Sequence, residues 1–327
     1  MAKKQHEGPS GLIVVDKPAG MTSHDVVSRV RRLTQTRKVG HAGTLDPMAT
    51  GVLILGIGKA TKLLTWLIGE SKTYTATMRL GISTATDDME GEILAIAESV
   101  LVDAVSDEQI VAEVAQLTGD ILQVPASVSA IKVDGVRSYS RVREGQKIEL
   151  KARPVNISQF EVHSVTRSEI QVQAETVRVI DLEVTVSCSS GTYIRALARD
   201  LGAALGIGGH LTALRRTCIG ENQVEQAYSL DALAQIRERE EPLPLLSLED
   251  AAAQLFAVRQ LSATEATDLS HGRRIAPSKP TGQQETSAAY APEGTLLALI
   301  ENTTFRGEPV AAPVLVFEAG KVFQEEA

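Results

Sequence analysis

Apolar and polar residues alternate along several short segments of the chain, a pattern typical of β-strands with one buried face. The clearest case is residues 72–80, where every second residue from Tyr74 onward is apolar and the residues between are threonines and an arginine. Residues 180–188 alternate in the same way and end at a Ser-Ser-Gly break. Continuous apolar runs at residues 11–15 and 52–57 predict two more strands, and we expect the second to be buried.

Helical periodicity appears between these strands. Thr22 and Asp25 form a candidate capping box for a helix whose apolar residues recur on one face up to Leu33. Strands that lie far apart in sequence, with interspersed helices and no regular βαβ rhythm, predict an α+β fold with a mixed, largely antiparallel sheet and flanking helices. Three more helices are predicted, at residues 61–68, 106–117 and 192–205. Residues 81–91 are predicted to form a polar loop.

A change in composition at residues 237–244 suggests a domain boundary, because charged residues give way there to two prolines, as where a helix runs into a linker. A short helix at 262–270 and alternating strands at 295–300 and 314–317 then predict a small β-rich domain. At the other end, residues 1–10 have no apolar core for a signal peptide and are expected to be a disordered tail.

Composition excludes several classes of protein. The 327 residues suffice for two domains, and no run of about eighteen apolar residues predicts a membrane span, so we expect no membrane partner. Cys188 and Cys218 stand far apart in sequence, and a reduced, cytoplasmic protein is the simpler interpretation. The six histidines are scattered without zinc-ligand spacing, so no metal site is expected.

The distribution of charge gives a mixed signal about nucleic acids. A net charge of −8 argues weakly against a nucleic-acid partner. Residues 29–38, however, hold five Lys or Arg and no acid, and residues 137–153 hold six basic side chains against two acidic ones. Each run fits a solvated helix face as well as an anionic partner, and both interpretations stay open at this point.

Three chemistry-bearing residues can be singled out from their local context. Asp46 lies in the loop His41–Gly51, where Pro47 forces it out of the helical region, although an Asp-Pro pair in a loop is more often only a turn. Tyr74 lies on the apolar face of its predicted strand, where a tyrosine is more often a core residue than a catalytic one. Arg195 lies in the first turn of an apolar helix, where burial would require an anionic partner; a catalytic carboxylate in that role would stay ionised.

The motifs taken together resemble the TruB family of tRNA pseudouridine synthases. They run in family order over about residues 11–220. The resemblance implies a catalytic domain, residues 11–244, followed by a small PUA-like RNA-binding domain, residues 245–327. The motifs that carry it are Asp16-Lys17-Pro18-Ala19-Gly20-Met21-Thr22-Ser23, His41 to Gly51, Lys72-Thr73-Tyr74, Thr84 to Gly91, Ser190-Gly191-Thr192-Tyr193-Ile194-Arg195, Asp200-Leu201-Gly202, Gly209-His210-Leu211 and Leu214-Arg215-Arg216.

The resemblance also implies roles for single residues. Asp46 matches the catalytic aspartate of the family, Tyr74 its base-stacking tyrosine, and Arg195 the arginine that pairs with the aspartate. The remaining matched positions concern substrate and RNA binding. His41 matches the histidine that helps to hold the flipped T-loop, and Asp88 and Leu214 match positions that line the uridine pocket. Lys17 and Pro18 belong to the motif that supports the Asp46 and Tyr74 segments, and Tyr193 lies beside Arg195 in its motif.

The activity implied is the isomerisation of one uridine in the T-loop of tRNA, position 55, to pseudouridine. The base would be flipped out and attacked by the aspartate. The reaction breaks N1–C1′ and forms C5–C1′ without net redox change, so no cofactor or metal is expected. Residues 123–155 resemble the insertion with which bacterial stand-alone members grip the T-arm, so we expect a tRNA partner, no guide RNA and a monomer.

Two other classes of function remain open. A tRNA-binding folding chaperone would need the basic runs and the C-terminal domain, but not Asp46, Tyr74 and Arg195. A carboxylate-based glycosidase would pair Asp46 with a second acid, for which Asp88 is available. The presence of all three residues together favours the synthase.

Overall fold

The computed structural model describes residues 8–126, 132–133, 136–137, 151–277 and 286–324. Residues 1–7 of the predicted tail, and most of both the insertion and its basic run, therefore lie outside the described residues.

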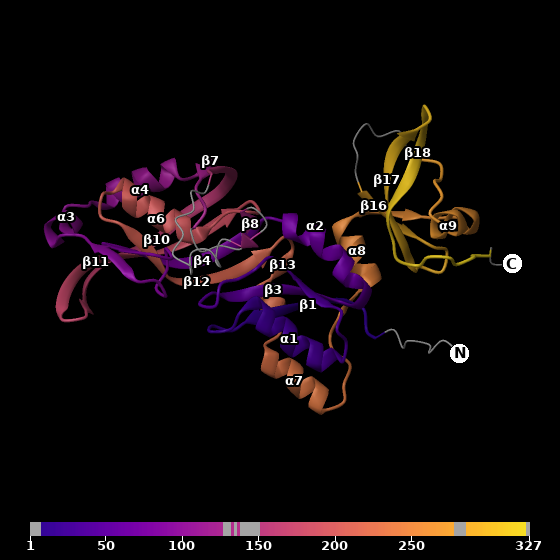
Figure 1. Ribbon diagram of the computed structural model, residues 1–327, viewed down its shortest axis with the longest axis horizontal. Helices are drawn as coiled ribbons and strands as arrows, with labels where there is room; N and C mark the ends of the chain where they lie inside the picture. Colours follow the sequence, from indigo (N-terminus) through magenta and orange to yellow (C-terminus); the bar gives the residue numbers. More distant parts are fainter. Residues whose placement is uncertain (1–7, 127–131, 134–135, 138–150, 278–285, 325–327) are drawn as a thin grey trace.

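One large mixed sheet and a smaller C-terminal sheet form the framework of these residues (Figure 1). The large sheet has the order β14-β1-β3-β12-β4-β11-β10-β7, with β2 beside β3 and β13 beside β12. Its pairs are antiparallel except for β12 with β3, so the predicted mixed, largely antiparallel sheet is confirmed. The strands are β1 (Gly11–Lys17), β2 (Val39–Ala42), β3 (Thr50–Ile57), β4 (Lys72–Leu80), β7 (Gly119–Gln123), β10 (Arg153–Val172), β11 (Glu175–Cys188), β12 (Gly209–Ile219), β13 (Asn222–Gln223) and β14 (Leu246–Ser247).

The apolar runs of β1 and β3 are continuous because helices cover both faces of these strands. Ile13 and Leu53 pack into the cluster that contains α1 and α7, whereas Leu12 and Val52 pack into the cluster that contains η1, α2 and α8. Figure 1 shows α1 and α7 side by side against this half of the sheet, and α4 and α6 near β4, β10 and β12. The helices are α1 (Ser23–Thr34), η1 (Gly58–Leu63), α2 (Leu64–Gly69), α3 (Ser99–Asp103), α4 (Asp107–Gln116), α6 (Ile194–Ala204), η2 (Val224–Gln226), α7 (Leu230–Glu238), α8 (Leu248–Leu255) and α9 (Ala263–Ser270).

Side-chain caps fix where several helices begin. Thr22 accepts a hydrogen bond from the Asp25 N–H, and the Asp25 carboxylate accepts one from the Thr22 N–H, which is the predicted capping box of α1. Ser106 and Gln109 cap α4 in the same way. Because such caps satisfy free N–H groups locally, these starts are encoded in a few neighbouring residues.

The long hairpin of β10 and β11 goes beyond the sequence prediction. Only residues 180–188 were expected as a strand, but β11 begins at Glu175 and pairs with the 20-residue β10. Most of β10 is exposed or half-buried, so it carries little of the apolar alternation that marks a strand. The predicted polar loop 81–91 likewise contains β5 (Ile82–Thr84), which pairs with β6 (Ile93–Ile96). A second short hairpin joins β8 (Lys132–Val133) and β9 (Val136–Arg137).

The small sheet has the order β15-β16-β17-β18 and packs against α9 on one side and α8 on the other. The boundary after residue 244 stays a prediction, but β14 still pairs with β1, and the separate sheet starts only at β15. Leu243 and Leu245 pack against the core of α1 and α7, so the predicted linker follows the surface of the larger domain. The strands are β15 (Ala257–Gln260), β16 (Thr286–Tyr290), β17 (Leu296–Phe305) and β18 (Glu308–Val316).

Candidate active site

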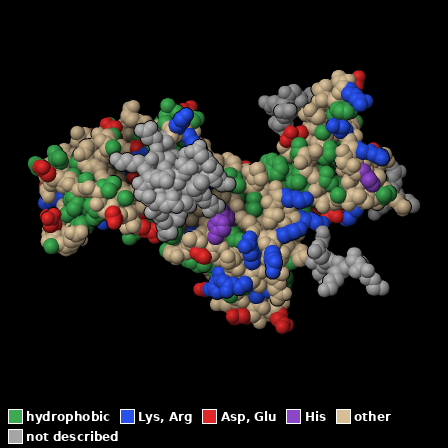
Figure 2. Space-filling model, viewed as in Figure 1, with side chains coloured by type: hydrophobic (Ala, Val, Ile, Leu, Met, Phe, Trp, Pro, Cys, Tyr) green, Lys and Arg blue, Asp and Glu red, His purple; other side chains and the backbone are tan. Residues whose placement is uncertain are grey.

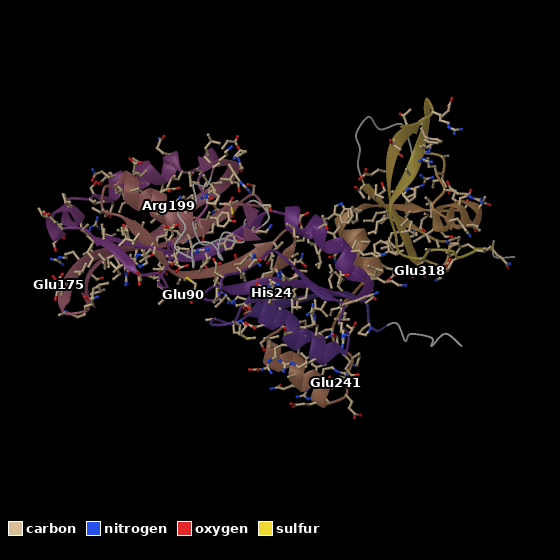
Figure 3. All side chains as sticks on the ribbon, in the orientation of Figure 1. His24, Glu90, Glu175, Arg199, Glu241 and Glu318 are labelled. Atoms are coloured by element: carbon tan, nitrogen blue, oxygen red, sulfur yellow. The ribbon has the colours of Figure 1, made fainter. Side chains whose placement is uncertain are left out.

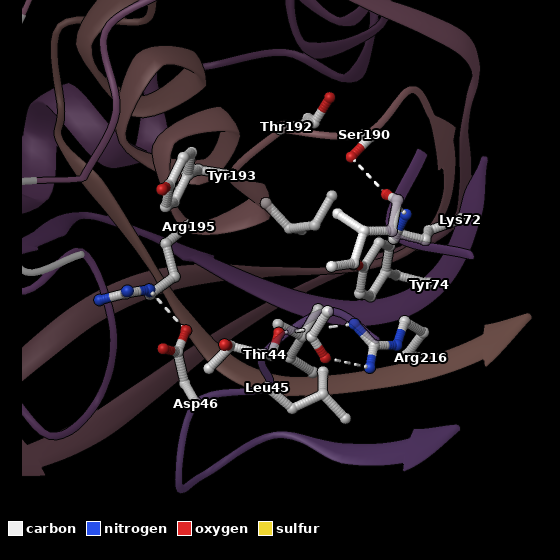
Figure 4. Close-up of a pocket in the computed structure, with 15 residues that line it drawn as sticks. Thr44, Leu45, Asp46, Lys72, Tyr74, Ser190, Thr192, Tyr193, Arg195 and Arg216 are labelled. Carbon is white, nitrogen blue, oxygen red and sulfur yellow. Dashed lines mark hydrogen bonds and ion pairs between the residues drawn. The ribbon is translucent and has the colours of Figure 1, made fainter. Parts of the chain in front are cut away.

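A cavity of about 290 Å³ opens beside the loop that joins β2 to β3. Its volume is close to the lower end of the range for small-molecule sites, roughly 300–1,000 Å³. Figure 4 shows Asp46 and Arg195 together at one side of it and Tyr74, Lys72 and Arg216 at the other. The residues that line it are Gly43, Thr44, Leu45, Asp46, Ile68, Lys72, Tyr74, Ser190, Gly191, Thr192, Tyr193, Ile194, Arg195, Leu214 and Arg216.

Arg195 joins two carboxylates from different parts of the chain. Its Nε lies 3.0 Å from Oδ2 of Asp46, and its Nη1 lies 3.1 Å from Oδ2 of Asp88. The Arg195 side chain is 6% exposed and that of Asp88 4%, whereas 37% of the Asp46 side chain remains exposed. The buried arginine thus has the anionic partner that its sequence context requires, and Asp46 is the carboxylate that faces the cavity.

Burial and charge act on Asp46 in opposite directions. Burial raises the pKa of the Asp46 carboxyl above its ordinary value of 3.8, the Arg195 guanidinium lowers it, and the Asp88 carboxylate raises it again. The net direction is upward. Arg195 therefore limits, without abolishing, the cost of keeping Asp46 ionised in the cavity.

The Asp46 loop is held from one side by Lys17, the last residue of β1, and by Ser23, the first residue of α1. The buried Lys17 ammonium donates to the main-chain carbonyls of Pro18, Met21 and Pro47. The Ser23 hydroxyl bonds both the N–H and the carbonyl of Leu45, the residue before Asp46. The loop is consequently fixed through its backbone, which leaves the Asp46 side chain to the cavity.

Arg216 on β12 holds the same loop from the other side. Its guanidinium is buried and donates to the carbonyl oxygens of Gly43 and Val52. Gly51 has φ of +99°, and a Cβ there would lie 2.1 Å from the carbonyl oxygen of Arg216. The parallel contact of β3 with β12 therefore requires glycine at this position.

The strand register brings the opposite wall of the cavity together. Lys72 and Tyr74 lie two residues apart on β4 and so share a face. On the neighbouring β12, Leu214 pairs with Ala76 and Arg216 with Tyr74. Burial raises the pKa of the Tyr74 phenol, and the nearby Arg216 guanidinium opposes that rise, so the phenol is neutral near pH 7.

The structure separates the predicted site residues into two groups. Asp46, Tyr74, Tyr193, Arg195 and Leu214 line the cavity together. The other four predicted residues, His41, Lys17, Pro18 and Asp88, do not line it. Asp88 pairs with Arg195, which does, and Lys17 donates to the carbonyl of Pro47, the residue after Asp46.

His41 lies on β2, just before the Asp46 loop. Its Nδ1 is buried and makes no hydrogen bond, and its ring meets that of His24 edge-on at 5.5 Å between centroids. Burial lowers the pKa of His41, so the ring is neutral at physiological pH.

Sequence reasoning assigned no role to Arg216 or Lys72, although both stand in the quoted motifs. The available signal was their spacing: Lys72 is two residues from Tyr74, and Arg216 two residues from Leu214, on strands with alternating faces. Among the residues that the structure describes, no group of three or more His, Cys, Asp or Glu side chains could hold a metal ion.

Comparison with known proteins identifies the family. The model of the N-terminal domain of TruB family pseudouridylate synthases matches residues 31–194. That of the tRNA pseudouridylate synthase B C-terminal domain matches residues 195–251, and that of the tRNA pseudouridine synthase II C terminus matches residues 256–318. The chain belongs to the TruB family of tRNA pseudouridine synthases. This synthase is therefore an isomerase that acts on tRNA.

Curated relatives cover nearly the whole chain. The tRNA pseudouridine synthase B of Paenarthrobacter aurescens (strain TC1) is 56% identical over 317 residues, which cover 95% of this chain and 96% of that protein. The protein of the same name from Thermobifida fusca (strain YX) is 52% identical over 300 residues, 92% of this chain and 97% of that one.

Solved structures share the fold of this synthase. A Cbf5-Nop10-Gar1 complex matches with a TM-score of 0.62 at 24% identity, over 96% of this chain and 85% of that one. The archaeal box H/ACA sRNP Nop10-Cbf5 complex matches with a TM-score of 0.63 at 22% identity, over 95% and 86% of the two chains. No helix in the described part of the synthase is long and apolar enough to span a membrane.

Proposed function

We propose that this synthase converts a uridine in the T-loop of tRNA, position 55, to pseudouridine, with Asp46 as the nucleophile. The observation that carries the proposal is the ion pair between Asp46 and the buried Arg195 at the edge of a cavity whose other wall contains Tyr74. An ionised carboxylate, a guanidinium that keeps it charged and an aromatic ring for the base are the groups that this isomerisation needs.

The reaction detaches the base at N1–C1′, turns it, and joins C5 to C1′. Asp46 attacks either C1′ of the ribose or C6 of the base and leaves again when C5–C1′ has formed. Tyr74, Leu214 and Tyr193 enclose the base while it is detached. The Tyr74 phenol also lies on the side of the cavity opposite Asp46, where it can relay the proton that C5 loses (Figure 4).

A base inside a folded T-loop must be flipped out before it can reach Asp46. The exposed basic side chains of residues 29–38 lie on and just beyond α1 and provide positive charge for the RNA backbone. Figure 2 shows Lys and Arg gathered over this part of the molecule. His41 lies between this surface and the Asp46 loop, where its ring can stack on an RNA base that the flipped uridine leaves behind.

The alternative functions fit the site less well. A glycosidase would need Asp88 as a free second acid, but Arg195, the Thr86 hydroxyl and the Glu90 N–H engage the Asp88 carboxylate. A chaperone that only folds tRNA would not need the Asp46–Arg195 ion pair. We further propose that the synthase acts as a monomer in the cytoplasm and without guide RNA or cofactor.

The proposal is tested with the purified full-length protein and a synthetic T-arm stem-loop RNA, with no other macromolecule added. We expect one pseudouridine at position 55, and none in a stem-loop that carries cytidine there. Modification at another position, or modification only after a guide RNA is added, would contradict the proposed substrate. Unmodified RNA that is nevertheless bound and refolded would favour the chaperone.

A further inference from the structure

The wall of the cavity that contains Tyr74 carries two buried cations. Lys72 is 7% exposed and Arg216 is 1% exposed. They lie close together, because a Cβ built on Gly43 would be 3.5 Å from Arg216 Nη1 and 3.6 Å from Lys72 Cε. Both residues line the cavity, on the same sheet face as Tyr74 and Leu214.

The hydrogen-bond partners of these two cations are main-chain carbonyls, and Arg216 also hydrogen-bonds the Tyr74 phenol. The Lys72 ammonium donates to the carbonyls of Ile68 and Glu70, and Arg216 donates to those of Gly43, Thr44 and Val52. Carbonyl oxygens satisfy the donors but do not neutralise the charge.

The charged groups around Lys72 compensate its positive charge only in part. The pKa of Lys72 is lowered to about 8, chiefly by burial and next by the Arg216 guanidinium, while Cys188 and Glu70 act in the opposite direction. Burial raises the pKa of the Cys188 thiol to about 11, so this neighbour is neutral at pH 7. Within the described part of the chain, neither cation forms an ion pair with a carboxylate. Two adjacent buried cations in this situation are costly, which suggests that an anion occupies this end of the cavity during function.

The chemistry proposed above supplies such an anion. When Asp46 attacks C1′, the N1–C1′ bond breaks and its electron pair stays on the base, where it spreads over N1, O2 and O4. When Asp46 adds at C6 instead, the π electrons of C5=C6 move toward O4. In either case one negative charge leaves the Asp46 carboxylate and appears on the uracil. In the C1′ route, C5 then bonds to C1′ as the bond between Asp46 and C1′ breaks. In the C6 route, C5–C1′ forms as N1–C1′ breaks, and the bond between Asp46 and C6 breaks as C5 loses its proton. In both routes C5 loses a proton, N1 gains one and the Asp46 carboxylate is restored, so atoms and charge balance.

This transfer of charge matches the layout of the cavity. In the proposed reaction, negative charge moves from Asp46, beside Arg195, to a base in the cavity, whose opposite wall carries Tyr74, Lys72 and Arg216 (Figure 4). Fixed charges aimed at the place where charge develops stabilise the transition state and need no reorganisation during the reaction.

We infer that Lys72 and Arg216 form the site that stabilises the negative charge of the uracil while it is detached or attacked. This inference rests on the proposed nucleophilic role of Asp46. The other anion that could bind here is an RNA phosphate. Phosphate contacts are normally made by exposed Lys and Arg, whereas these two side chains form a buried wall. In the proposed reaction, the base is the part of the nucleotide that enters the cavity.

Lys72 provides the cleaner test, because Arg216 also holds the Asp46 loop. Lys72→Gln removes the charge and keeps an N–H donor for the Ile68 carbonyl, Lys72→Met removes both, and Lys72→Arg keeps the charge. Lys62→Gln is the matched control, since Lys62 also donates to a main-chain carbonyl, that of Val316, but does not line the cavity.

Two quantities are measured for each folded variant. The first is the single-turnover rate of tritium release from bulk tRNA transcribed with 5-³H-uridine, which does not depend on which uridine is modified. The second is the equilibrium affinity for the same tRNA over a range of salt concentrations. If the modified uridine lay outside the T-loop, the rates of the variants could still be compared with that of wild type. If the wild-type protein released no tritium from any tRNA, the proposed chemistry itself would be contradicted.

We expect Lys72→Gln to lower the single-turnover rate by about 10²-fold with little change in affinity or in its salt dependence. Lys72→Arg should recover most of the rate, and Lys62→Gln should resemble wild type. Weaker binding with a shallower salt dependence and an unchanged rate would assign Lys72 to an RNA phosphate and overturn the inference. Equal loss in Lys72→Gln and Lys72→Arg would overturn it too, because the fold and not the charge would then be responsible.

Discussion

At the scale of single residues, the site depends on one guanidinium that serves two carboxylates. Arg195 contacts Asp46 and Asp88 through different nitrogens and is itself buried. Removing it would leave two carboxyl groups without their cation in a partly dry pocket. The residue therefore controls both the charge and the orientation of Asp46.

Arg195→Met should change the pH dependence of the reaction. Asp46 is active as the carboxylate, and burial raises its pKa, so activity is lost as pH falls through that raised value. Because Arg195 opposes the rise, its removal should move the acid limb of kcat/KM to higher pH and lower kcat/KM at pH 7 by about 10²-fold. The measurement is a pH profile of kcat/KM on tRNA.

Arg199→Met is the control for this profile. Arg199 lies one turn further along α6 and pairs with Asp87 and Asp200 (Figure 3). Its removal should leave the acid limb in place. An acid limb that moves equally in both variants would show that the shift does not come from the Asp46–Arg195 contact.

At the scale of elements, the Asp46 loop is held between β1 and β12 by buried side chains that bond its backbone. The close approach of β3 to β12 at Gly51 is part of this arrangement. The position of Asp46 is therefore fixed by elements on both sides of the loop.

Gly51→Ala tests how tightly this junction is packed. The added Cβ would meet the Arg216 carbonyl, and φ of +99° is unfavourable for alanine, so we expect the free energy of unfolding to fall by about 3 kcal/mol. Gly119→Ala is matched in φ, +89°, but has open space around it, and should cost about 1 kcal/mol. Urea unfolding measures both; equal losses would show that β12 yields easily at this contact.

Sequence patterns predicted the helices and strands that are determined by neighbouring residues. The alternation of residues 72–80 coincides with β4, and Ser262 caps α9 as the predicted 262–270 helix requires. Strand β10 escaped prediction because its residues contact the core only in part. A prediction from sequence thus succeeds where burial imposes a period on the chain.

The site was predictable to a different degree for each residue. The expected burial of the Arg195 guanidinium required an anionic partner, but only the family resemblance indicated that Asp46 was that partner. For Lys72 and Arg216, the spacing from Tyr74 and Leu214 indicates only a shared strand face. Their main-chain carbonyl partners are not encoded in any side-chain pattern. The proximity of these two cations follows from the register of β4 and β12, which depends on the whole sheet.

At the scale of the whole molecule, the small sheet shares a core with the large domain. Leu296, Leu299 and Phe317 belong to the same apolar cluster as Leu12 and Leu64. At the same junction, Lys59 pairs with Glu318, which Figure 3 labels, and Lys62 lies over the Phe317 ring. We therefore expect the two domains to unfold together.

Phe317→Ala should destabilise both domains at once. The side chain is 6% exposed, and its loss should cost about 3–5 kcal/mol. Phe305→Ala, at a position 39% exposed on the hairpin of β17 and β18, should cost about 1 kcal/mol or less. Calorimetry should show one transition that shifts to lower temperature in Phe317→Ala; a second transition confined to the small domain would contradict a shared core.

The central claim is that turnover depends on the Asp46 carboxylate, and tritium release from tRNA labelled with 5-³H-uridine tests it most directly. Asp46→Asn keeps the shape of the side chain and removes its charge. The account predicts that this variant binds tRNA as wild type does and releases tritium slower by about 10³-fold or more. Release at the wild-type rate by Asp46→Asn would contradict the account.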